Sequence, residues 1–448
     1  MVNNTSTPKS PMTMMMENGR NVTVGAGNGR ASGVLRSAES IVSQVSVEMR
    51  NNNNITRLDM LHFSDRRDGP TQAPPPQVGN PLFFYLPPVG CSTPAKLHPL
   101  YHSARHECDS WLLSALKPKT QAYAQFLVQS LHPLFVCLTM PRAIGSRVAP
   151  LCKLLALLFV LDNFSDELGV LDINPVNNVS VSEKDFYLHI LDLLQDKHGS
   201  SVGTADFEAS AELSEMSGLI VRTWDEIKAE MPANQQRRFL GIIGELFHET
   251  LRQSEKREQT QGGVIDLGTY LSFRRITGGG YVFMIMSEFG TGIDLDDEVV
   301  EHPDIMKLQE LVAYHVAYVN DLLSFRKEFC LGHHQNLPSI LCVHEGYNLQ
   351  ESIFRLCVMI RGLDDEFVSL KKKVSMNTSL MERQGVQEYL EVLGYVMSGF
   401  LEWGYQTGRY HGLNNHLTLR HGLVSLVHLD FTLITQGVAK SELFADYT

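Results

Sequence analysis

The chain has 448 residues, of which 43% are hydrophobic and 20% are charged, a composition typical of a globular protein with one large domain or two. Its formal net charge of -12, with no basic block, argues against a nucleic-acid-binding surface. The seven cysteines form no Cys-x-x-Cys pair, and no apolar run reaches the roughly 18 residues of a membrane span. We therefore expect no disulfide framework, no zinc site, no membrane span, and a reduced, cytoplasmic location.

The chain has two regions that differ in composition and in apolar periodicity. Residues 1–78 are rich in Asn, Ser, Thr, Met and Gly and show little apolar periodicity, so we expect a disordered extension. Residues 82–88 form an apolar strap that its prolines keep out of a helix. Helical periodicity then continues almost to the end, and strand-type alternation is nearly absent. The expected helices are 105–116, 119–135, 143–168, 184–196, 207–230, 234–257, 266–275, 279–289, 303–328, 350–373, 382–405 and 412–437.

This pattern predicts an all-α fold in which residues 79–448 form a single domain with a core of antiparallel helices. The first oxygen-rich motif follows the run 151–161, which is apolar almost all round, as in a buried helix. Asp162 and Asp166 are four residues apart and therefore share a helix face. Carboxylates at the C-terminal end of a helix are unfavourable unless a cation compensates them. An acidic turn that leaves the helix for solvent is the alternative interpretation.

The second oxygen-rich motif lies within the helix expected at 303–328. Asn320, Ser324 and Glu328 are spaced four residues apart and form one polar line on that helix. Their amide, hydroxyl and carboxylate groups all offer oxygen, the ligand that Mg²⁺ prefers, and Lys327 adds a cation beside them. A solvated helix face is the alternative for this motif alone. If the two helices face each other, the motifs enclose a multi-metal site above an apolar cavity, which suits a diphosphate.

Fixed cations that a diphosphate would need are offered at two further places. Arg274 lies one turn before the glycine run 278–280, which breaks a helix and lets the backbone approach a ligand closely. An arginine in this position can donate two hydrogen bonds to phosphate oxygens. Arg409 stands beside Tyr410, whose hydroxyl can also bond a diphosphate. An ordinary turn and an ordinary loop are the alternatives for these two places.

The motifs together resemble those of the class I terpene synthases. From Pro81 to the end, the sequence pattern is similar to that of fungal sesquiterpene cyclases. Residues 162–166 (DNFSD) resemble the aspartate-rich motif of the family, with Asn in the second place instead of the commonest residue. Residues 320–328 match the Asn-Asp-x-x-Ser-x-x-x-Glu metal motif in full, including the Lys before the Glu.

The resemblance extends to the residues between and after the two metal motifs. Arg274 matches the diphosphate-sensing arginine of the family, 46 residues before the second motif. Thr277 falls on the linker position, where the family often has Asp, and Gly278 falls on the effector position. Residues 409–410 match the C-terminal Arg-Tyr pair, and Trp403 fits the cavity tryptophan of many members.

What the resemblance implies is a helical bundle around an apolar cavity that binds three Mg²⁺ ions, with Mn²⁺ as an alternative ion. Asp162 and Asp166 would be metal ligands from the first motif. Asn320, Ser324 and Glu328 would be metal ligands from the second motif. Binding of the metals and substrate would close the site and exclude water, which otherwise quenches a carbocation.

The same resemblance implies a substrate and the groups that hold it. The diphosphate would be held by Arg274, Lys327, Arg409 and Tyr410. The catalytic set would be Asp162, Asp166, Arg274, Thr277, Gly278 and Tyr410. Phe159 and Trp403 would form the cavity wall, because an aromatic face attracts a cation. Farnesyl diphosphate is the expected substrate, and a sesquiterpene hydrocarbon or alcohol is the expected product.

Three alternatives stay open. A terpene synthase that uses geranyl or geranylgeranyl diphosphate has the same motifs, since cavity depth sets the substrate length. A prenyl-chain-elongating enzyme resembles this class but uses two aspartate-rich motifs, and the set Asn320, Ser324 and Glu328 argues against it. A non-catalytic helical interaction protein is the third alternative, and the intact ligand set argues against it. The product and the oligomeric state, a homodimer included, are left open by the sequence.

Overall fold

The computed structural model describes residues 83–168, 183–195, 211–260, 263–330, 332–411 and 422–426. It describes only the backbone of residues 164–168, 183, 211–213, 411 and 425. The chain divides into the units Met1–Gly69 and Pro70–Thr448, and every described residue lies in the second unit. The extension expected at 1–78 lies outside the described residues and stays a prediction.

The described part of the chain is helical apart from one pair of short strands, which confirms the predicted all-α fold. Its longer helices are α2 (Tyr101–Leu116), α3 (Gln121–Gln129), α4 (His132–Thr139), α5 (Gly145–Leu168), α6 (Glu183–Leu194), α8 (Ala211–Lys228), α9 (Ala233–Gln259), α10 (Leu267–Thr277), α11 (Gly280–Thr291), α13 (Pro303–Cys330), α14 (Leu337–Glu345), α15 (Leu349–Ser375) and α17 (Val386–Gln406). Its short elements are α12 (Asp297–Val300), α16 (Thr378–Met381), α18 (Gly408–His411), β1 (Phe83–Tyr85) and β2 (Leu423–Ser425). No helix in these ranges is both long enough and apolar enough to cross a membrane.

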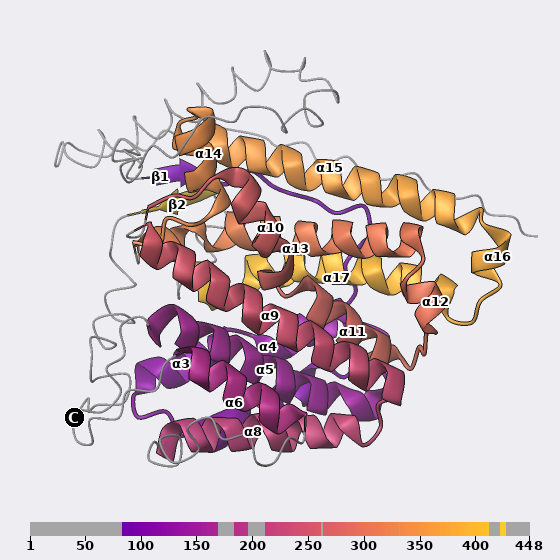
Figure 1. Ribbon diagram of the computed structural model, residues 1–448. Helices are drawn as coiled ribbons and strands as arrows, with labels where there is room; N and C mark the ends of the chain where they lie inside the picture. The colour runs from indigo at the N-terminus through magenta and orange to yellow at the C-terminus, as the bar shows by residue number, and fades with distance from the viewer. Residues whose placement is uncertain are drawn as a thin grey trace, which may run out of the picture. The chain divides into compact units, whose positions relative to one another are not determined.

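Helix α13 is the central element of the bundle, and it packs against α15 on one side and α17 on the other (Figure 1). Helix α17 in turn packs on α4, which packs on α5. Helices α6 and α9 are in contact, α9 packs on α10 and α11, and both α10 and α11 pack on α13. The two helices that carry the oxygen-rich motifs, α5 and α13, therefore belong to one continuous set of packed helices.

The break between α10 and α11 brings this part of the chain very close to α13. Gly279 has φ of 76°, in the left-handed region that favours glycine. A Cβ atom at Gly278 would lie 2.8 Å from the Cβ atom of Ala317, and one at Gly280 would lie 2.8 Å from the Cα atom of Ala313. Because small residues meet on both sides, the break reaches backbone contact with the helix that carries the second motif.

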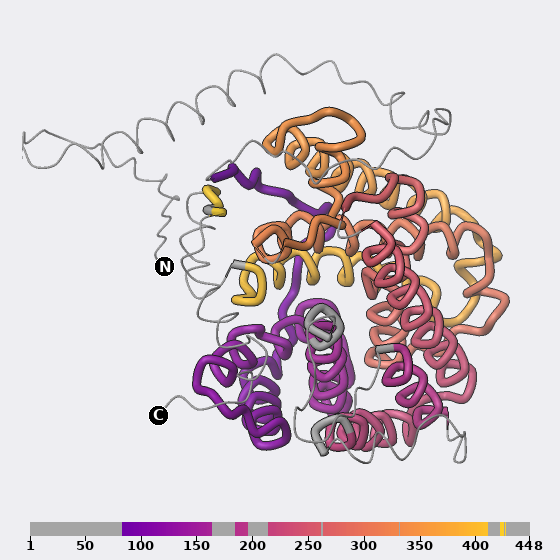
Figure 2. The backbone as a smooth tube through the Cα atoms, turned by 60° about the vertical axis from the view of Figure 1, so that its left-hand side comes forward, coloured from indigo at the N-terminus to yellow at the C-terminus, as the bar shows by residue number. Residues whose placement is uncertain are grey.

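The apolar strap predicted at 82–88 contains no helix where it is described, and its residues 83–85 form β1, which pairs antiparallel with β2 (Figure 2). Gln350 of α15 accepts from the backbone N–H of Tyr85 at 2.7 Å and donates to its carbonyl at 2.8 Å. The ring of Phe84 packs edge-on against Phe325 of α13, with ring centroids 5.6 Å apart. The strap therefore rests on the same helix that carries the second motif.

The short helices α12, α16 and α18 were not predicted, and the structure differs from the predicted longer helices most clearly in three places. The single run expected at 119–135 is two helices, because Leu131 has φ of 53° and breaks the run after Ser130. Helix α14 was not predicted. The helix expected at 412–437 is wrong at residues 423–425, which form β2 and pair with the strap, and most of the rest of that range lies outside the described residues.

Candidate active site

The first oxygen-rich motif is bound by the arginine of the C-terminal pair. Arg409 donates from Nη2 to Oδ2 of Asp162 at 2.5 Å and from Nη1 to Oδ1 of Asn163 at 2.6 Å. The Arg409 side chain is only 4% exposed, whereas the Asp162 side chain is 61% exposed. The guanidinium is therefore fixed by its surroundings, and the carboxylate reaches it from the open side. Asp166 lies one turn later on α5, and its side chain is not among those described.

The second motif lies on one face of α13, as its spacing predicts. The hydroxyl of Ser324 donates to Oε1 of Glu328 at 2.6 Å, and the amide of Asn336 donates to Oε2 of the same carboxylate at 2.6 Å. Desolvation, followed by the charge of Asp321, raises the pKa of Glu328 above its ordinary value. Asn336 is fully buried in the turn before α14 and was not expected as a site residue.

A buried ion pair joins Arg274 to the second motif. Asp321 is 1% exposed and accepts from the hydroxyl of Tyr270 at 2.6 Å and from Nε of Arg274 at 2.9 Å. Nη2 of Arg274 also donates to the side-chain oxygen of Asn320. Burial alone would lower the pKa of Arg274, but the Asp321 carboxylate outweighs it and the pKa is raised. The Asn-Asp pair inside the motif could have indicated this role for Asp321.

Tyr410 connects the C-terminal pair to the second motif. Its hydroxyl accepts from the side-chain amide of Asn320 at 2.9 Å. Burial of this hydroxyl raises the pKa of Tyr410 to about 12, so it stays a neutral donor near neutral pH. Arg409 therefore contacts the first motif through Asp162, and the adjacent Tyr410 contacts the second motif through Asn320. The structure thus brings the two motifs to opposite sides of one site.

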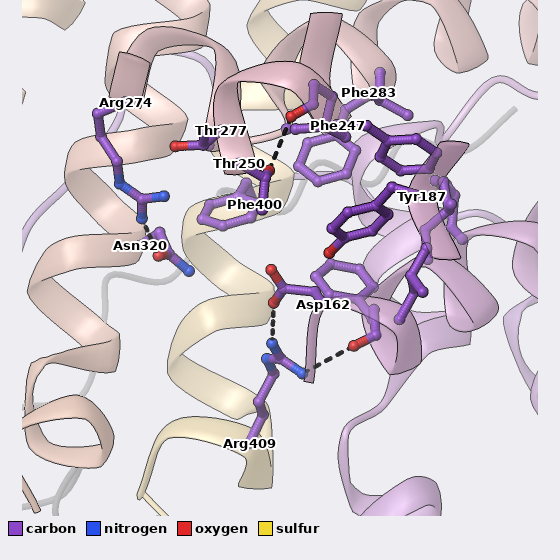
Figure 3. A pocket seen from close by; sticks show the side chains of 18 residues that line it. Asp162, Tyr187, Phe247, Thr250, Arg274, Thr277, Phe283, Asn320, Phe400 and Arg409 are labelled. Carbon is purple, nitrogen blue, oxygen red and sulfur yellow. Dashed lines mark hydrogen bonds and ion pairs between the residues drawn. The ribbon is translucent and has the colours of Figure 1, made fainter. Parts of the chain in front are cut away.

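An apolar cavity adjoins these motifs (Figure 3). The empty space in it and in its open mouth together is about 820 Å³. Asp162, Asn320, Arg274 and Arg409 lie at its polar end. Its aromatic lining comes from Phe159, Tyr187, Phe247, Phe283 and Phe400. Thr277 and Gly278, at the end of α10 and the start of the break, also line this cavity.

A second, polar cavity shares the mouth of the apolar one. Both are lined by Asp162, Thr250, Arg274, Thr277, Asn320 and Arg409. The polar cavity is also lined by Ser324, Lys327, Glu328 and Tyr410. Sequence reasoning missed Thr250 and four further lining residues, which are Gln253 and Arg257 on α9 and His333 and Gln335 before α14. Their positions depend on how distant helices pack, so the local sequence carried no signal for them.

Trp403 does not lie where the sequence analysis placed it. It is fully buried and is not among the described residues that line the apolar cavity, whereas Phe159 is. Its indole N–H donates to the carbonyl of Ser130 at 3.0 Å, which holds the ring one layer behind the wall. The ring centroid lies 5.1 Å from that of Phe159, and His132 stacks on the same phenylalanine at 5.4 Å. Trp403 therefore supports the wall and does not form it.

The donor set at the polar end fits a hard divalent cation, since it offers only oxygen. The oxygens come from a carboxylate on α5 and from an amide, a hydroxyl and a carboxylate on α13, in Asp162, Asn320, Ser324 and Glu328. Among the described residues, no three His, Cys, Asp or Glu side chains gather into a metal cluster. A site of this kind would therefore combine amide and hydroxyl ligands with carboxylates and with oxygens of the ligand itself.

Comparison with known proteins agrees with this arrangement. Residues 153–363 match the family described as terpene synthase family 2, C-terminal metal binding. Over 348 residues the chain is 28% identical to microbial terpene synthase-like protein 13 of Selaginella moellendorffii, across 77% of this chain and 92% of that protein. It is 26% identical to sesquiterpene synthase Agr3 of Cyclocybe aegerita, across 78% of this chain and 95% of that protein.

The fold is similar to that of solved terpene synthases. The linalool/nerolidol synthase of Streptomyces clavuligerus superposes with a TM-score of 0.58 at 18% identity, across 72% of this chain and 99% of that one. The sequence matches and the metal motifs support a class I terpene synthase, a lyase, and the structural likeness shows the helical fold of that class. The resemblance inferred from the motifs is confirmed, and the matched metal-binding region is consistent with a divalent metal.

Proposed function

We propose that this terpene synthase ionises farnesyl diphosphate with the help of Mg²⁺ and cyclises the carbocation to a sesquiterpene hydrocarbon or alcohol. The observation that carries the proposal is the link made by Arg409 and Tyr410, which connects both ligand sets at the mouth of an aromatic cavity. The relative Agr3 is named a sesquiterpene synthase, which favours a C15 substrate.

The residues that would hold the metal are those of the two oxygen-rich motifs. Asp162 and Asp166 would act from α5, and Asn320, Ser324 and Glu328 would act from α13. We expect three Mg²⁺ ions, with Mn²⁺ as an alternative. When bound, such ions would neutralise the negative charge that develops on the departing diphosphate.

Four donors would hold the diphosphate, namely Arg274, Lys327, Arg409 and Tyr410. The guanidinium of Arg409 is engaged with Asp162, and that of Arg274 is engaged with Asn320 and Asp321. If a bound diphosphate attracted these guanidinium groups, the side-chain oxygens of Asp162 and Asn320 would become available to bind the metal. Fixed donors of this kind stabilise charge as it develops, because they need no reorganisation during the reaction.

The hydrocarbon chain would lie in the apolar cavity against the rings of Phe159, Phe283 and Phe400. Aromatic faces attract a carbocation, and closure of the mouth over bound substrate would keep water from quenching it. Thr277 and Gly278 line the cavity at the end of α10, where the family resemblance places the linker and effector residues. The close contact of Gly278 with Ala317 would fix these two positions relative to the second motif.

The experiment is to incubate the purified protein with farnesyl diphosphate and Mg²⁺, with and without EDTA, and to analyse the extract by gas chromatography–mass spectrometry. We expect a cyclic sesquiterpene that forms only in the presence of metal. Product from geranyl or geranylgeranyl diphosphate alone would contradict the C15 assignment but keep the reaction class. No product from any of the three diphosphates would favour a non-catalytic role.

A further inference from the structure

Helix α9 closes the polar cavity on a side that neither metal motif occupies. Thr250, Gln253 and Arg257 follow one another on α9 at spacings of three and four residues, so they share one face of the helix. All three line the polar cavity, together with the ligand oxygens of Asp162 and Glu328. A face with this composition offers hydrogen-bond donors to whatever the cavity binds.

Thr250 marks the boundary between the two cavities, because it lines both. Its hydroxyl donates to the carbonyl of Leu246 at 2.8 Å, so this donor is already used within the helix. Gln253 and Arg257 line the polar cavity but not the apolar one. The polarity of α9 therefore changes at Thr250, from the hydrocarbon end of the site to the charged end.

The three arginines of the polar cavity differ in what holds them. Arg274 is paired with Asp321, and Arg409 is paired with Asp162. Among the residues that the structure describes, the guanidinium of Arg257 has no hydrogen bond or ion pair. It is partly exposed at the wall of a cavity whose other charged groups are mostly cations. Arg257 is therefore the arginine of this cavity whose donors are available to an anionic ligand.

We propose that Arg257, assisted by Gln253, is a further substrate-binding residue that holds the diphosphate from the α9 side. An arginine presents a planar fork of N–H donors that matches two phosphate oxygens, and charge-assisted hydrogen bonds of this kind are strong. Arg274, Arg409 and Arg257 come from three different helical segments, so together they surround the anion. This inference rests on the proposed function, because it names a further contact to the same diphosphate.

The test compares three variants, Arg257→Gln, Arg257→Lys and the matched control Lys256→Gln. Lys256 is exposed, bonds Gln259 at 3.0 Å and does not line either cavity. Lys256→Gln removes one positive charge from the same helical turn, so it shares any effect on net charge or on the helix dipole. The measurements are kcat and KM for farnesyl diphosphate with Mg²⁺, and the thermal stabilisation by inorganic pyrophosphate with Mg²⁺.

For Arg257→Gln we expect kcat/KM to fall about ten- to a hundredfold, mainly through a higher KM, and the stabilisation by pyrophosphate to shrink. Arg257→Lys should recover part of both effects, and Lys256→Gln should match the wild-type protein. Equal KM values and equal pyrophosphate stabilisation in Arg257→Gln and Lys256→Gln would overturn the proposal.

The two readouts also separate this proposal from the proposed function. If the wild-type protein does not turn over farnesyl diphosphate, the C15 assignment fails. Stabilisation by pyrophosphate that depends on Arg257 would then still support the binding role. If the wild-type protein makes product and Arg257→Gln behaves as Lys256→Gln in both measurements, the binding role fails and the function stands.

Discussion

The guanidinium of Arg409 lies 2.5 Å from the carboxylate of Asp162, and it is buried although its partner is exposed. The next residue, Tyr410, bonds Asn320 of the second motif. Two consecutive residues near the end of the described chain therefore join two helices whose metal motifs are far apart in the sequence. This relationship makes the site dependent on the position of the short helix α18.

Arg409→Lys should lower kcat/KM for the natural substrate by about tenfold or more. Lysine keeps the positive charge but offers a single point of attachment, so it cannot donate to Asp162 and Asn163 from two separate nitrogens as the guanidinium does. The measurement is steady-state kinetics with product detection. Arg237→Lys, at an exposed ion pair, is the control and should leave the kinetics unchanged. Unaltered kinetics in Arg409→Lys would show that donation from two guanidinium nitrogens is not needed.

Glu328→Gln should reduce turnover by at least about a hundredfold, because it removes the charge of a carboxylate in the proposed ligand set. The amide can still accept from Ser324 or Asn336, so the circular dichroism spectrum should not change. Turnover is measured at saturating Mg²⁺. Near-normal activity together with a normal melting temperature would contradict the assignment of Glu328 as a metal ligand.

Asp321→Asn should destabilise the fold by about 3–5 kcal/mol, because it leaves Arg274 as a buried charge without its partner. Urea unfolding followed by circular dichroism gives this free energy of unfolding. Asp297→Asn breaks the exposed pair with Arg237 and should cost less than about 1 kcal/mol. A similar small loss in both variants would show that the buried pair does not hold Arg274 in place.

Gly278→Ala should lower the free energy of unfolding by about 1–3 kcal/mol. The added Cβ atom would lie 2.8 Å from the Cβ atom and 3.1 Å from the Cα atom of Ala317, so α10 and α13 would have to move apart. Gly241→Ala on α9 is the matched control, because its Cβ atom would have no neighbour within 4 Å. That control should gain about 0.5–1 kcal/mol from helix propensity. Stability changes of the same sign in both variants would contradict the close approach.

His132→Phe should make the protein less sensitive to acid. Burial, followed by the charge of Arg409, lowers the pKa of His132 from 6.5 to about 3. The folded state then binds fewer protons than the unfolded state, so stability is complete above pH 6.5 and is lost as the pH falls towards 3. Between pH 6.5 and 5 the wild-type protein should lose about 1.5 kcal/mol more than the variant. Parallel stability curves for the two proteins would rule out a buried neutral imidazole.

Much of the fold could be predicted from the sequence, because amphipathic periodicity and helix-breaking residues act locally. The run 303–328 and the break at 278–280 both follow this rule. The strand at 423–425 does not, since its conformation depends on pairing with residues 83–85 from the other end of the described chain. Its Leu-Val-Ser sequence carries no local signal that separates strand from helix.

In the site, too, positions set within one helix could be predicted, whereas positions set by packing between helices could not. The spacing of Asn320, Ser324 and Glu328 predicts a shared face, because all three lie on one helix. The place of Trp403 depends on the carbonyl of Ser130, which is available to its indole N–H because α3 ends at Gln129. Residues that reach the site from a neighbouring helix, such as Arg257, depend on packing that one sequence does not reveal.

The most direct measurement of whether the two ligand sets form one site is calorimetric titration of inorganic pyrophosphate into the protein, with and without Mg²⁺. Pyrophosphate should bind at least about tenfold more tightly in the presence of Mg²⁺, since the carboxylates of Asp162 and Glu328 line the same cavity and would otherwise weaken the attraction of its arginines for the anion. Addition of EDTA should weaken binding to the metal-free level. Equal binding with and without metal, or no binding under either condition, would contradict a shared metal-diphosphate site.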